Sequence, residues 1–66
     1  MQIYLNGEER QFPDELTMGE LVQQLDLGER RFAIEVNEEL VARSSFDRYR
    51  LQSGDRVEIV HAIGGG

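Results

Sequence analysis

One stretch of the chain has the periodicity of an α-helix, and this feature constrains the fold more than any other. Its apolar residues recur every three or four positions and share one helix face; they are Met18, Leu21, Val22 and Leu25. Thr17 and Glu20 have the spacing of a capping box, in which each residue satisfies a backbone N–H near the helix start. Gly28 is expected to end the helix in a left-handed conformation. The sequence therefore predicts one main helix.

The segment before this helix has the alternation of apolar and polar residues that is typical of β-strands. A first strand is predicted over residues 2–5, and Asn6-Gly7 is the strongest short signal for a hairpin turn. A second strand is predicted over residues 9–12, because Pro13 has no N–H to donate to a strand ladder.

The second half of the chain has the same strand-type alternation. Strands are predicted over residues 32–36, 40–41 and 56–61. Ser44 and Asp47 have capping-box spacing, which predicts a short helical turn between the last two strands. The predicted fold class is α+β, with one mixed sheet of four to five strands packed on one main helix. We expect the first and last strands to be neighbours at its centre.

The face of the sheet that turns away from the helix is expected to carry Tyr4 and Val60, on the two strands predicted to pair. Ala62 and Ile63 follow directly. An apolar patch there would indicate a surface that binds a protein partner. The alternative is that these are scattered exposed residues, which are normal on protein surfaces. His61 is either an ordinary strand residue or part of that interface.

The net charge of −6 argues against nucleic acid as a partner, because phosphate contacts require cations. Residues 1–40 hold ten acids and three arginines, whereas residues 41–66 hold three acids and four arginines. There is no cysteine, no apolar run near the ~20 residues that span a bilayer, and no signal-peptide pattern. We therefore expect no membrane association and a cytoplasmic location.

The side chains offer no recognisable catalytic or metal-binding arrangement, since there is one histidine and neighbouring carboxylates lie in predicted turns. We expect no enzymatic activity, no metal and no bound cofactor. The remaining reactive group is the carboxylate of Gly66. Residues 1–63 are expected to form the domain, and Gly64, Gly65 and Gly66 a flexible tail. Three extended residues reach about 10 Å, and without Cβ atoms they could enter a narrow channel of a partner.

Together these features resemble the ubiquitin-like β-grasp proteins. The resemblance lies in the strand–strand–helix order, in VNEELVAR before a helical turn, in LQSGDRVEIV and in the terminal glycines. Among these proteins the chain is most similar to the ThiS family, the sulfur carriers of thiamine biosynthesis, over essentially its whole length. It departs from the family at Ala42-Arg43, where proline-arginine is common, and at Phe46, near a common tryptophan.

The resemblance implies that a ThiF-like adenylyltransferase uses ATP and Mg to adenylate Gly66. Sulfur from a cysteine desulfurase persulfide then displaces AMP and leaves a thiocarboxylate, which donates sulfur to a ThiG-like thiazole synthase. One alternative is a sister carrier for molybdopterin synthesis, tRNA thiolation or amino-acid biosynthesis. Others are a ubiquitin-like modifier and a non-catalytic interaction module.

Overall fold

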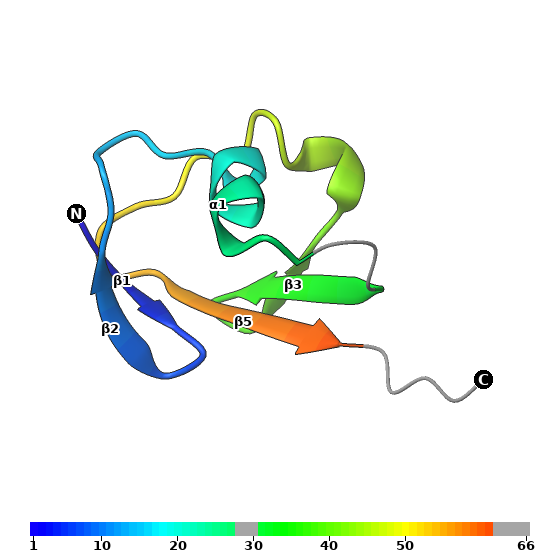
Figure 1. Ribbon diagram of the computed structural model, residues 1–66, viewed down its shortest axis with the longest axis horizontal. Helices are drawn as coiled ribbons and strands as arrows, with labels where there is room; N and C mark the ends of the chain where they lie inside the picture. The colour runs from blue at the N-terminus through cyan, green and yellow to red at the C-terminus, as the bar shows by residue number, and fades with distance from the viewer. Residues whose placement is uncertain (28–30, 62–66) are drawn as a thin grey trace.

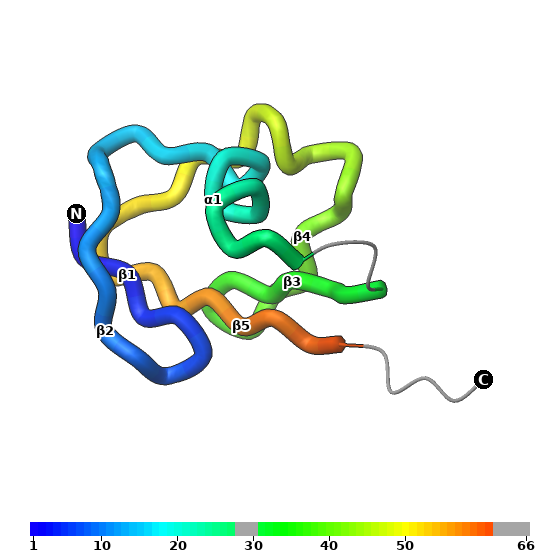
Figure 2. The backbone as a smooth tube through the Cα atoms, viewed as in Figure 1, coloured from blue at the N-terminus to red at the C-terminus, as the bar shows by residue number. Residues whose placement is uncertain are grey.

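In the described part of the chain, five strands form one mixed sheet in the order β2-β1-β5-β3-β4, and one α-helix packs against one of its faces (Figures 1 and 2). The computed structural model describes residues 1–27 and 31–61. The elements are β1 (Gln2–Leu5), β2 (Glu8–Gln11), α1 (Met18–Leu25), β3 (Phe32–Val36), β4 (Glu39–Val41), the 3₁₀ helix η1 (Arg43–Ser45) and β5 (Arg56–His61). The predicted α+β class is confirmed.

The strand directions explain why the sheet is mixed. β1 runs parallel to β5, whereas β2 is antiparallel to β1 and β3 is antiparallel to both β4 and β5. The first and last strands are neighbours, as predicted, and β5 is the central strand. β2 begins one residue earlier than predicted, because the Asn6-Gly7 turn sets Leu5 directly opposite Glu8.

Helix α1 begins at the capping box that the sequence predicts. The Thr17 hydroxyl accepts a hydrogen bond from the Glu20 N–H at 3.2 Å, and the Glu20 carboxylate accepts one from the Thr17 N–H at 2.9 Å. The helix ends at Leu25 because Asp26 takes the left-handed conformation, with φ 51° and ψ 55°. The predicted helix end at Gly28 is therefore wrong, and Gly28 itself lies outside the described residues.

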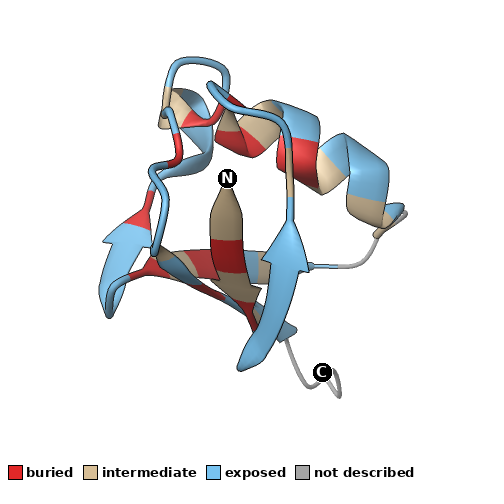
Figure 3. Cartoon of the chain, turned by 90° about the vertical axis from the view of Figure 1, so that its left-hand side faces the viewer, coloured by how far each residue is buried: buried red, intermediate tan, exposed pale blue. Residues whose placement is uncertain are grey.

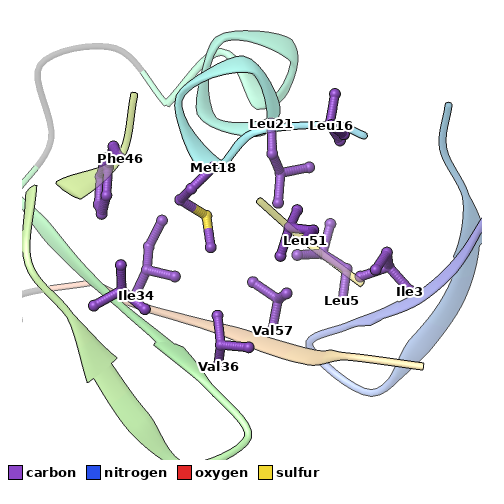
Figure 4. Packing of buried hydrophobic residues seen from close by; sticks show 11 residues of the cluster. Ile3, Leu5, Leu16, Met18, Leu21, Ile34, Val36, Phe46, Leu51 and Val57 are labelled. Carbon is purple, nitrogen blue, oxygen red and sulfur yellow. The ribbon is translucent and has the colours of Figure 1, made fainter. Parts of the chain in front are cut away.

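The core fills the space between α1 and the sheet (Figures 3 and 4). Met18 and Leu21 point from the helix toward the sheet, where they meet side chains from β1, β3 and β5. The fully buried side chains are Ile3, Met18, Leu21, Ile34 and Val57. In the part of the chain that the structure describes, no element covers the opposite face of the sheet (Figure 1).

The connection between β4 and β5 also packs on the helix side. Its 3₁₀ helix begins after Ala42, whose side chain makes no capping hydrogen bond. The predicted capping box of Ser44 and Asp47 is wrong, because Ser44 lies inside this short helix. The Gly19 N–H donates to the Phe46 carbonyl at 2.9 Å, and a Cβ on Gly19 would lie 3.0 Å from Asp47 Oδ1. The missing side chain of Gly19 thus brings α1 close to this segment.

Candidate functional site

The end of β5 is the place from which the last residues of the chain depart, so the candidate site is built around it. β3 pairs with β5 from Val57 to His61, with Phe32 opposite His61. β1 pairs only with Arg56 and Val57 at the start of β5. In the described part of the chain, the last residues of β5 therefore have a strand neighbour on one side only. The end of β5 and the N-terminus lie at opposite ends of the molecule (Figure 1).

Asn6 supports β5 at the point where β1 leaves it. Its backbone N–H donates to the Val57 carbonyl, and its side-chain Oδ1 accepts from the Ile59 N–H, both at 2.8 Å. Asn6 has a φ of 50°, a left-handed conformation that asparagine tolerates better than most residues. The Asn6 side-chain oxygen thus accepts the bond that a backbone carbonyl of β1 would accept if that strand continued. It extends the hydrogen bonding along this edge of β5 from Val57 to Ile59.

Arg43 supports β3 opposite the end of β5. Because Val41 pairs with Ile34, residue 43 falls beside Phe32, just beyond the end of β4. Arg43 Nη2 donates to the Phe32 carbonyl at 3.0 Å, and its guanidinium carbon lies 4.3 Å from the centre of the Phe32 ring. The sequence alone does not identify Arg43 as a site residue, since this proximity depends on the register between β3 and β4.

The exposed face of the sheet carries an apolar stripe near the end of β5. Val60 is 49% exposed and pairs with exposed Ala33 of β3. Leu40 of β4 is 71% exposed and pairs with Glu35, which lies two residues from Ala33 on the same face of β3. We call Val60, Ala33 and Leu40 the apolar stripe. The sequence identified only Val60 of the three. Alternation with buried Val41 was the signal that could have placed Leu40 on this face.

Tyr4 lies on the same face but does not belong to the stripe. The parallel register sets Tyr4 opposite Arg56, whose guanidinium carbon lies 5.9 Å from the centre of the Tyr4 ring. Arg56 and Glu58 therefore stand between Tyr4 and Val60, and the prediction that these two form one apolar patch is wrong. A shallow hollow of about 310 Å³ is lined here by Tyr4, Gly7, Arg56, Val57 and Glu58.

The other predicted site residues, Ala62, Ile63, Gly64, Gly65 and Gly66, lie outside the described residues, so their roles stay predictions. Within residues 1–27 and 31–61, no group of three or more histidine or acidic side chains is placed to hold a metal ion. None of the helices in these two ranges is long and apolar enough to cross a membrane.

The fold and the site define a class of protein. A mixed sheet wrapped over one helix, with an exposed face and a central last strand, is the ubiquitin-like β-grasp architecture. The description of the ThiS family matches residues 3–66, and the chain belongs to this family. The crystal structure of the thiamine biosynthesis protein ThiS from Geobacter metallireducens superposes with a TM-score of 0.87. The two chains are 29% identical, and each is covered over 100% of its length.

Several curated relatives are similar over all 66 residues. The sulfur carrier protein ThiS of Escherichia coli K12 is 32% identical and is covered over 100% of its own length. A thiazole synthase of Paramagnetospirillum magneticum is 41% identical. The chain spans only 20% of the length of this thiazole synthase, so the match is to a segment of a much longer protein.

Proposed function

We propose that the protein is a sulfur carrier that holds sulfur as a thiocarboxylate on Gly66. The observation that carries this proposal is the match to the ThiS family, which extends through the terminal glycines to residue 66. The full-length similarity to a sulfur carrier protein ThiS supports the same role. The chain would act as a co-substrate with no turnover of its own, and its sulfur would enter the thiazole of thiamine.

The proposed chemistry begins when the Gly66 carboxylate attacks the α-phosphorus of ATP and pyrophosphate leaves. The acyl adenylate then has a good leaving group, which the free carboxylate lacks. A persulfide sulfur attacks the carbonyl carbon and AMP leaves, which forms an acyl disulfide. A thiol cleaves that disulfide, becomes part of a new disulfide and leaves the thiocarboxylate. ATP and Mg belong to the partner enzyme in this scheme.

The proposed partners follow from this scheme. A ThiF-like adenylyltransferase activates Gly66, and a cysteine desulfurase supplies the persulfide without needing a lasting complex. A ThiG-like thiazole synthase accepts the sulfur. A protein named thiazole synthase contains a segment that is 41% identical to this chain. This supports the thiazole synthase as a partner, because domains joined in one polypeptide often work together. These reactions would take place in the cytoplasm.

The proposed docking surface is the exposed face of the sheet. The apolar stripe would contact the partner beside the departing tail, and Ala62 and Ile63 would continue that contact. Tyr4 would form a separate contact, since its side chain is half-buried beneath the Arg56 guanidinium. Large exposed apolar side chains that gather on one face are typical of partner surfaces.

Mass spectrometry of the intact protein tests the proposal after incubation with ATP, the adenylyltransferase and a sulfur donor. We expect replacement of one oxygen by sulfur, located at Gly66. A variant that lacks only Gly66 should fold normally and remain unmodified. Formation of an isopeptide bond with another protein would indicate a modifier, and no covalent change would indicate an interaction module. A native polypeptide that continues uncut past Gly66 would also contradict the proposal.

A further inference from the structure

The two ends of the central sheet differ in charge. At the turn end, where β5 begins, Glu39 pairs with Val36, which pairs in turn with Val57, and Asp55 accepts a hydrogen bond from Asn37 of the turn between β3 and β4. We call the other end, where β5 finishes, the exit end. The register places His61 and Arg43 on either side of Phe32, and exposed Arg31 directly precedes Phe32 in the sequence. In a protein of net charge −6, Arg31 and Arg43 thus lie near the end of β5.

Arg43 is held in a defined position at the exit end. One N–H donates to the Phe32 carbonyl at 3.0 Å, and the guanidinium carbon lies over the Phe32 ring, 4.3 Å from its centre. A guanidinium has five N–H donors, so most of them remain for another acceptor. An arginine that is already ordered loses less side-chain entropy when it binds, which favours it as an interface contact.

We propose that the exit end binds carboxylate side chains at the rim of the channel through which the adenylyltransferase takes up the tail. This inference rests on the proposed function and adds which side chains the adenylyltransferase would use to recognise the carrier. An acidic rim would attract Arg43 and Arg31 and repel the acidic turn end, so that the carrier approaches with its tail first. Electrostatic complementarity of this kind raises association rates and selects orientation.

The phosphate of the nucleotide is the other anion that these cations could meet. Gly66 is five positions after His61 in the sequence. An extended chain advances about 3.3–3.6 Å per residue, so an adenylate on Gly66 in a channel would lie about 17 Å from His61. This span exceeds the reach of an arginine side chain that is anchored on Phe32. The geometry therefore favours the rim of the channel over the nucleotide.

The test measures the KM for the carrier in the adenylyltransferase reaction, followed by pyrophosphate release, at several ionic strengths. Arg43→Gln should raise KM about tenfold at low salt, flatten its dependence on salt and leave kcat unchanged. Arg43→Lys should keep the salt dependence because it keeps the charge. Arg10→Gln, which removes an exposed arginine of β2, is the matched control and should behave like the wild type.

Loss of the Arg43 contact with Phe32 could also loosen the end of the sheet, so thermal unfolding is measured for each variant. Arg31→Glu is the second probe, because Arg31 precedes β3 and is exposed. Arg31→Glu should also raise the KM for the carrier, as Arg43→Gln does. Wild-type KM and salt dependence in both Arg43→Gln and Arg31→Glu would overturn the inference. If the wild-type carrier is not adenylated at all, the proposed function fails, and the inference fails with it.

Discussion

The backbone N–H of Ile59 donates a hydrogen bond of 2.8 Å to the side chain of Asn6, across 53 residues of sequence. This bond joins the first hairpin to the last strand, at the point where β1 no longer runs beside β5. The direction of β5 therefore depends on this contact and on its pairing with β3. The hairpin turn therefore contributes to the geometry of the candidate site.

We predict that Asn6→Ala lowers the free energy of unfolding by about 1–3 kcal/mol. The variant leaves the Ile59 N–H without its partner and places an alanine at a φ of 50°. Urea denaturation measures the loss. Asn6→Asp keeps an acceptor oxygen and tolerates the same φ, so it should retain most of the stability. Equal losses in the two variants would contradict the role given to the side-chain oxygen.

A second prediction concerns the helix stripe. Leu21 is 0% exposed and points from α1 into the core, so Leu21→Ala should cost about 2–5 kcal/mol of stability. In a domain of this size that loss lowers Tm by about 4–8 °C for each kcal/mol. Gln24→Ala, on the exposed side of the same helix, should change the stability little. Calorimetry of both variants provides the comparison, and a near-zero effect of Leu21→Ala would mean that the helix is packed differently.

The apolar stripe can be tested with a charge. Val60 is about half exposed, so Val60→Asp should change the stability by no more than about 1 kcal/mol. Burial of the new carboxylate against a partner should weaken binding of the thiazole synthase or the adenylyltransferase by about tenfold or more. Gln24→Asp adds the same charge on the helix, away from the stripe, and should leave binding unchanged. A large drop in Tm for Val60→Asp would instead place Val60 in the core.

The capping box predicts a specific dependence of stability on pH. Hydrogen bonds from the Thr17 backbone N–H and then from its hydroxyl lower the pKa of Glu20. Because the folded-state pKa lies below the unfolded value, the stabilisation is present above about pH 4.3 and is lost as the pH falls through the folded pKa. Glu20→Gln should therefore be less stable than the wild type near neutrality, and this gap should close in acid. Urea midpoints between pH 3 and pH 7 measure it, and a gap that widens in acid would refute the assignment.

The sequence predicted the elements well, because each depends on local periodicity. The alternation of residues 56–61 matches β5 residue for residue, and the Thr17–Glu20 capping box is present as expected. The errors also have local causes. Asp26 ends the helix before Gly28, and Ser44 falls inside η1 instead of capping it. Asp and Ser can each occupy several positions near a helix end, and the packing around each residue decides which position it takes.

The sequence by itself determined the α+β class, the exposed position of Val60 and the resemblance to the ThiS family, which includes the glycines up to Gly66. Only the tertiary structure decided which exposed residues gather together. The parallel register of β1 and β5 separates Tyr4 from Val60, and the register of β3 with its two neighbours places Arg43 and His61 on either side of Phe32. The physical reason is that side-chain alternation specifies the face on which a residue lies. Its position along the neighbouring strand follows from how the whole core packs.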